Sequence, residues 1–176
     1  FTQADLIAGY RLCDALPNIG FVMSIGIPSD VPAHATYDVQ MALMLEHTRK
    51  PLVFVTNDRE SCQRAIDMAA AVAGGYEALA EQQHILLYSE PSSPLKQSET
   101  AVDKLLLMAD YRLPVVHSPG PQMGATAPIT MAGGLVMSIA EILSSIVVHQ
   151  LRRPGAPFVF GAGLHHMDMG AMQICY

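Results

Sequence analysis

Short apolar runs alternate along the chain with longer segments of helical period, and this alternation restricts the possible folds more than any other feature. Five apolar runs predict buried strands, at Phe21–Ile27, Pro51–Val55, Ile85–Tyr88, Leu113–His117 and Pro157–Phe160. The segments before and between them predict helices, at Asp5–Leu16, His34–His47, Glu60–Ala73, Tyr76–Ala80, Ser98–Ala109 and Thr126–Leu151. Since strands and helices alternate, we expect the strands to run parallel and to be joined by helical crossovers.

Several of the expected helices carry end signals. Asn57 or Asp58 is placed to cap the third helix, which stops at Gly74, and Ser98 is placed to cap a later one. Pro128 falls in the first turn of the last helix, where the missing N–H of proline costs no hydrogen bond.

Two architectures contain a parallel sheet with helical crossovers: an open doubly wound sheet and a (β/α)₈ TIM barrel. The doubly wound dinucleotide-binding fold needs a GxGxxG turn, and Gly161-Ala162-Gly163 supplies only its first half before His165 and His166. The sequence therefore favours the barrel. A whole barrel takes about 250 residues, so we expect residues 1–176 to be part of a single barrel domain and to supply about five of its strand–helix units.

Charge and cysteine content bear on the partners. The formal net charge is −6, whereas nucleic acids and anionic membrane surfaces attract basic patches, so we expect neither as a partner. The three cysteines are widely spaced, with no CxxC pair and no Cys/His cluster, which argues against a disulfide framework and a metal site. Reduced thiols and the lack of a signal-peptide pattern fit a cytoplasmic protein.

The apolar segment Met131–Val148 has nearly the length of a membrane span. Glu141 lies in its middle, and a charge at the bilayer centre costs about 2.5–3.5 kcal/mol on insertion scales. We therefore expect a buried helix of a soluble protein. The apolar stretch from Pro128 to Val148 is also a candidate interface for a homo-oligomer.

Function in a barrel is expected at the carboxyl ends of the strands. Glu90 and His117 end apolar strands in successive units, and we expect them to converge as catalytic residues, because a carboxylate and an imidazole can hold a cation or move a proton. Tyr88, two residues before Glu90, should lie on the same side of its strand and bind substrate. A tyrosine ring beside a carboxylate suits a quaternary ammonium group.

Other polar residues at strand ends have simpler interpretations. Asp30, Asn57 and Asp58 are most simply caps and turn formers. His165 and His166, followed by Asp168, resemble a metal motif. Adjacent residues of a strand face opposite ways, however, and spacing places no third ligand, so no metal is expected.

Five segments in chain order resemble the trimethylamine methyltransferase family, which includes trimethylamine:corrinoid methyltransferases and relatives that demethylate quaternary amines such as glycine betaine. The segments are Phe21–Pro32, Tyr88–Leu95, Pro119–Gly133, Arg153–Pro157 and Met167–Met169. The resemblance implies a (β/α)₈ barrel and transfer of a methyl group from a methylated amine to the Co(I) of a cognate corrinoid protein. The corrinoid (cobalamin) is then carried by that partner, and none is bound tightly to this chain.

The resemblance leaves Glu90 and His117 in the roles argued above, and Tyr88, Ser24, His165 and His166 as substrate-binding candidates. It also implies that four glycines let the ligand or the corrin approach the backbone closely: Gly120, Gly124, Gly161 and Gly163. Trimethylamine and quaternary amines both fit such a site.

Two alternatives stay open at this point. Another class of barrel enzyme, such as an aldolase, would need a Schiff-base lysine at a strand end, and none of Lys50, Lys96 and Lys104 is placed there. The second alternative is a binding module that recognises a methylated amine without reacting with it.

Overall fold

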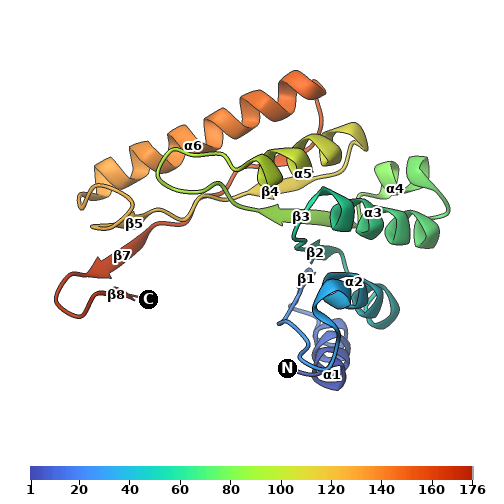
Figure 1. The fold of residues 1–176 in the computed structure, drawn as a ribbon. Helices are drawn as coiled ribbons and strands as arrows, with labels where there is room; N and C mark the ends of the chain where they lie inside the picture. The colour runs from blue at the N-terminus through green and yellow to red at the C-terminus, as the bar shows by residue number, and fades with distance from the viewer. Residues whose placement is uncertain (176) are drawn as a thin grey trace. The chain divides into compact units, whose positions relative to one another are not determined.

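The structure, a computed structural model, describes residues 1–175 (Figure 1). The chain divides into two compact units. The first comprises Phe1–Leu87 with Tyr111–Pro114, and the second comprises Tyr88–Asp110 with the chain from Val115 onward. The strands of the larger sheet alternate with helices along the chain, which confirms the α/β class.

The first unit begins with α1 and contains four α-helices that pack in succession along the chain. Strand β1 pairs in parallel with β2, and β2 pairs in parallel with Ile85–Leu87 of β3. The elements are α1 (Gln3–Ala15), β1 (Val22–Met23), the 3₁₀ helix η1 (Ala33–Ala35), α2 (Thr36–His47), β2 (Leu52–Phe54), α3 (Arg59–Ala73) and α4 (Tyr76–Gln82), followed by β3 (Ile85–Ser89).

Local signals explain where these helices begin and end. The Asp58 side chain caps α3 by accepting from the Ser61 N–H at 2.8 Å, and Gly74 ends that helix at φ 94°, a left-handed conformation that glycine adopts without strain. Asp30 accepts from the Gln3 N–H at 3.0 Å, so this carboxylate satisfies a free donor at the start of α1. The predicted capping roles of Asp30, Asp58 and Gly74 are confirmed.

The second unit contains two helices and two groups of strands. Helices α5 and α6 pack against each other, and β4 pairs in parallel with β6. A smaller three-stranded sheet has the order β5-β7-β8, with β7 and β8 antiparallel. The elements are α5 (Glu99–Asp110), β4 (Val115–His117), β5 (Gln122–Met123), α6 (Met131–Arg152), β6 (Phe158–Val159), β7 (His165–Asp168) and β8 (Gln173–Cys175).

The larger sheet has five strands in the order β1-β2-β3-β4-β6. All five correspond to runs predicted as strands, and β3 contributes residues to both units. The predicted parallel sheet is confirmed.

Two predicted boundaries were wrong, and one small sheet was not predicted. The first strand covers only Val22–Met23, because only these two residues of the predicted run pair with β2. The last helix begins at Met131 rather than near Thr126, since the Gln122 carbonyl accepts from the N–H groups of 125–127 and closes a turn there. The smaller sheet was missed because its strands are short and polar, without the apolar runs on which the strand predictions rested.

Helix α6, which was expected to be a buried helix, is buried along one stripe only. Thr130 caps it by accepting from the Gly133 N–H at 3.3 Å. By length and composition it is the one helix among residues 1–175 that could cross a membrane, and 28% of its most apolar window is buried. The buried stripe is Gly134, Ser138, Glu141, Ile142, Ser145 and His149.

Candidate functional site

Tyr88 and Glu90, at the carboxyl end of β3, lie together as predicted. The Tyr88 hydroxyl donates to Glu90 Oε1 at 2.5 Å, with the carboxylate exposed and the tyrosine half-buried. Burial, followed by the hydrogen bond to Glu90 and the charge of its carboxylate, raises the pKa of Tyr88 to about 12. The phenol therefore stays protonated near neutral pH and remains a donor. The pair offers a negative charge beside an aromatic ring, which can bind a cation.

The His117 side chain, in β4, lies on the face of the sheet opposite to the Tyr88 side chain of β3. The Ser118 N–H donates to the Ser89 carbonyl at 3.0 Å, which in a parallel ladder places Ser89 opposite His117. Both residues are buried, and Tyr88, adjacent to Ser89 in β3, points to the opposite face. The structure thus places Tyr88 and His117 on opposite faces and does not bring Glu90 and His117 together as a pair.

The surroundings of His117 keep its ring neutral. The side chain is 0% exposed, and burial, followed by the positive charge of Lys104, lowers its pKa to about 4. Its Nε2 lies 3.0 Å from Gln97 Oε1. At neutral pH His117 is therefore a neutral hydrogen-bonding group.

Gln97 determines which nitrogen of His117 carries the proton. Gln97 Nε2 donates to the Glu141 carbonyl at 3.1 Å, and a carbonyl can only accept, so the amide nitrogen faces α6. The amide oxygen therefore faces His117 and accepts from it. The proton is assigned to Nε2, which leaves the buried Nδ1 as an acceptor without a hydrogen-bond partner.

Two of the predicted glycines and His165 meet beside the ends of β4 and β6. The Gly163 N–H donates to the Pro119 carbonyl at 2.9 Å, which joins the two loops. A Cβ placed on Gly120 would lie 3.8 Å from His165 Nε2, and one on Gly163 would lie 3.3 Å from the same atom. Along the second loop, a Cβ on Gly161 would meet Val116 at 3.9 Å.

The other predicted residues have separate surroundings. Gly124 has φ +92°, and a Cβ there would lie 2.8 Å from Met169 Sδ, so glycine is required both by the turn and by packing. His166 is exposed in β7, beside the half-buried His165. Ser24 follows β1 in the first unit and is half-buried. Among residues 1–175, no group of three His, Cys, Asp or Glu side chains is placed to hold a metal ion.

Glu141 belongs to this region but was not among the residues predicted from the sequence. Its carboxylate is 1% exposed and accepts from Ser93 Oγ at 2.8 Å and from the Leu95 N–H at 2.7 Å. The signal was visible as a lone carboxylate in the middle of an apolar helix, and we used it only as an argument against a membrane span.

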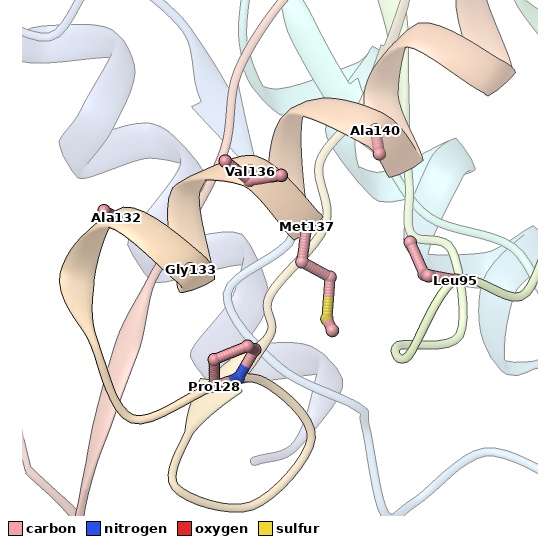
Figure 2. A pocket seen from close by; sticks show the side chains of 7 residues that line it. All are labelled: Leu95, Pro128, Ala132, Gly133, Val136, Met137 and Ala140. Atoms are coloured by element: carbon pink, nitrogen blue, oxygen red, sulfur yellow. The ribbon is translucent and has the colours of Figure 1, made fainter.

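An apolar groove of about 440 Å³ adjoins the loop that Glu141 contacts (Figure 2). Figure 2 shows the Met137 side chain, from α6, directed into the space between Leu95 and Pro128. The groove is lined by Leu95, Pro128, Ala132, Gly133, Val136, Met137 and Ala140.

Comparison with known proteins identifies the family. The pattern of the trimethylamine methyltransferase (MTTB) family matches residues 2–174. The trimethylamine methyltransferases MttB of Desulfitobacterium hafniense and Methanosarcina barkeri are each 30% identical to the chain, over 97% and 95% of its length and 34% of their own. A glycine betaine methyltransferase of D. hafniense is 24% identical over 84% of the chain and 31% of its own length.

The chain spans about a third of the length of these relatives. The match nevertheless covers nearly all of the present sequence and includes every strand of the larger sheet. The chain belongs to the trimethylamine methyltransferase (MTTB) family.

Proposed function

We propose that this chain forms part of a (β/α)₈ barrel methyltransferase that moves a methyl group from a methylated amine to the Co(I) of a corrinoid protein. Family membership supports the reaction class, since the relatives are named for trimethylamine and for glycine betaine. The five-stranded parallel sheet with helical crossovers supports the barrel, because parallel sheets of this kind occur in α/β folds. In a barrel, residues 1–175 lie within a single domain.

The pair of Tyr88 and Glu90 is the observation that supports this proposal most directly. A quaternary amine such as glycine betaine, or protonated trimethylamine, carries a positive charge spread over methyl groups. The exposed Glu90 carboxylate supplies the opposite charge, and the Tyr88 ring supplies a polarisable face. Because Tyr88 stays protonated, it does not add a second negative charge that would repel Glu90.

In the proposed reaction the corrinoid is a substrate, carried by the partner protein. The cobalt(I) electron pair forms a Co–C bond with the methyl carbon while the C–N bond breaks and its electron pair leaves with the nitrogen. This chain contributes proximity and orientation. Gly120, Gly161 and Gly163 would leave room for a bulky acceptor to approach the loops after β4 and β6, since none of them carries a side chain.

The test is methylation of cob(I)alamin by the purified protein, followed by absorbance, with glycine betaine and trimethylamine offered separately. We expect methylcobalamin from one of the two amines. The Glu90→Gln variant should raise KM for that amine about tenfold or more, since losing one charge contact of about 1.4 kcal/mol changes affinity tenfold. Tyr88→Phe should have a smaller effect, because the ring remains.

Glu81→Gln is the matched control, since Glu81 is an exposed glutamate on α4. It should leave KM unchanged. Formation of no methylcobalamin from either amine by a folded protein would contradict the proposed reaction. An unchanged KM in Glu90→Gln would contradict the proposed amine site.

A further inference from the structure

The loop between β3 and α5 begins with Pro91, directly after Glu90, and closes on itself. Ser92 and Lys96 exchange backbone hydrogen bonds of 2.8 and 3.2 Å, so the residues between them form a compact turn. Pro91 is buried at the start of this loop, whereas Leu95 near the tip of the turn is 64% exposed. Polar contacts join the turn to another element of the second unit.

Glu141, on α6, makes two of these contacts. Its two carboxylate oxygens each accept one hydrogen bond from the turn, from Ser93 Oγ at 2.8 Å and from the Leu95 N–H at 2.7 Å. Burying a carboxylate costs several kcal/mol unless donors surround it. The Glu141 carboxylate, which is 1% exposed, is thus matched by donors that come from this loop.

Gln97 makes the third attachment, at the end of the loop. Its amide nitrogen donates to the Glu141 carbonyl and to Ser145 Oγ at 2.9 Å, and its oxygen accepts from His117 of β4. The loop is therefore fixed to α6 by two residues of the turn and to both α6 and β4 by Gln97. These attachments begin three residues after Glu90.

We infer that Glu141 is a positioning residue for the amine site: by holding the turn at Ser93 and Leu95, it sets the direction in which Glu90 leaves β3 and keeps the Glu90 carboxylate on the Tyr88 hydroxyl. The inference rests on the proposed function for the meaning of that carboxylate. The geometry itself can be tested without turnover, since the Tyr88–Glu90 hydrogen bond is observable directly.

The first experiment observes the Tyr88 ring by NMR in protein labelled with ¹³Cζ-tyrosine. Tyr88→Phe assigns its signal among the six tyrosines, and Glu90→Gln gives the position of that signal when the carboxylate is gone. In Glu141→Ala we expect the Tyr88 signal to move toward its position in Glu90→Gln. In Glu141→Gln it should stay near the wild-type position, because the amide can accept from the Leu95 N–H and donate to Ser93 Oγ.

The control is Leu143→Ala, which changes an exposed residue on the same helix and should not move the signal. An unmoved Tyr88 signal in folded Glu141→Ala protein would overturn the inference. If that variant does not fold, Ser93→Ala removes one of the two donors. It should move the signal in the same direction by less, and an unmoved signal there overturns the inference as well.

The second experiment separates this inference from the proposed function. Tetramethylammonium is titrated into each variant by calorimetry. We expect Glu141→Ala to weaken its binding several-fold and Glu141→Gln to restore it. If the wild-type protein binds no tetramethylammonium, the proposed amine site fails, while the NMR result still decides whether Glu141 positions Glu90. If wild type and Glu141→Ala bind it equally, the positioning role fails and the amine site stands.

Discussion

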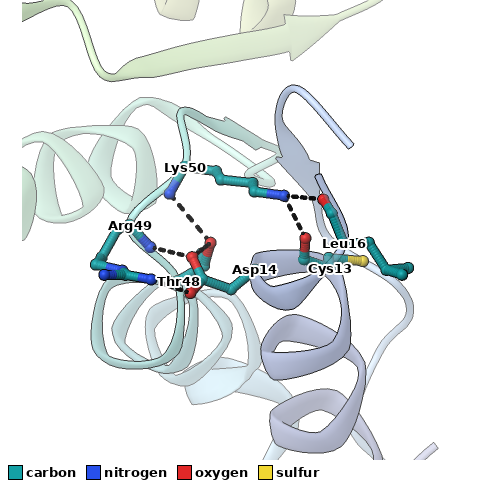
Figure 3. A network of polar contacts seen from close by, with 6 residues as sticks. All are labelled: Cys13, Asp14, Leu16, Thr48, Arg49 and Lys50. Carbon is teal, nitrogen blue, oxygen red and sulfur yellow. Dashed lines mark hydrogen bonds and ion pairs between the residues drawn. The ribbon is translucent and has the colours of Figure 1, made fainter. Parts of the chain in front are cut away.

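Two polar networks join distant parts of the sequence, one in each unit, and they differ in exposure. In the first unit Asp14, at the end of α1, accepts from the backbone and guanidinium of Arg49 at 2.8 and 3.1 Å (Figure 3). Lys50 donates to the carbonyls of Cys13 and Leu16 at 2.6 and 2.5 Å. The Arg49 side chain is 92% exposed, whereas Glu141, at the centre of the network in the second unit, is 1% exposed.

Solvent exposure determines how much each contact contributes to stability. Water can replace the partners of Arg49 when the ion pair breaks, so such a pair contributes little to stability. Water cannot easily reach the buried carboxylate of Glu141, so a lost donor there leaves its oxygen unsatisfied. The location differs as well. Lys50 lies at the amino end of β2, and Glu141 contacts the loop at the carboxyl end of β3.

The largest expected effect is on Glu141. Glu141→Ala should lower the free energy of unfolding by about 3–4 kcal/mol, because it removes two hydrogen bonds to a charged carboxylate, each worth about 1.5–3 kcal/mol. Urea denaturation measures this loss. Glu141→Gln should lose less than about 1 kcal/mol, since its amide can replace both contacts. If Glu141→Ala lost less than about 1 kcal/mol, the buried network would be no stronger than the exposed one.

His117 should make stability depend on pH. The pKa of His117 is about 4 in the folded protein and 6.5 in the unfolded chain. The unfolded chain therefore binds more protons between these two pH values. The contribution of His117 to the free energy of unfolding should therefore be fully present above pH 6.5. It should fall by about 3 kcal/mol as the pH drops toward 4. Denaturant titrations across this range measure the slope, and His117→Gln should reduce it.

Two other histidines change stability in the same direction, since burial lowers the pKa of both His84 and His149. The difference between wild type and His117→Gln isolates the contribution of His117. Asp14 provides the contrast from the exposed network. The hydrogen bond from the Arg49 N–H is the largest cause of the lowered pKa of Asp14, so the contribution of Asp14 to stability is present above the ordinary carboxyl pKa of 3.8 and is lost at lower pH. Equal slopes of stability against pH in wild type and in His117→Gln would contradict the role assigned to His117.

Lys50 should have an intermediate effect. Lys50→Met keeps the apolar stem but removes the ammonium that satisfies two carbonyls at the end of α1, so we expect a loss of about 1–2 kcal/mol. Thermal or urea unfolding of the variant measures it. An undiminished stability would mean that water satisfies these carbonyls equally well.

Arg49 should have the smallest effect. Arg49→Ala removes only the exposed guanidinium, since the backbone N–H still reaches Asp14, and we expect a loss of at most about 0.5 kcal/mol that shrinks further at high salt. Unfolding curves at low and high salt give this value. A loss above about 1 kcal/mol would remove the contrast between the two networks.

The sequence by itself determined the order of the main elements and many of their ends. Apolar runs located the five strands of the larger sheet, and the caps Asp58 and Gly74 marked the ends of α3. The pairing of Tyr88 with Glu90 also followed from alternation along one strand. These features depend on residues within a few positions of one another, so their physical causes are present in any local stretch of the chain.

Only the tertiary structure determined the strand register and the contacts between distant segments of the chain. The register of β3 against β4 places Ser89 opposite His117 and so separates His117 from Tyr88, although all three residues lie at strand ends. Glu141 finds its donors on Ser93 and Leu95, 48 and 46 residues earlier in the chain. Periodicity does not encode such contacts, because a buried carboxylate is stable only where folding brings its donors to it.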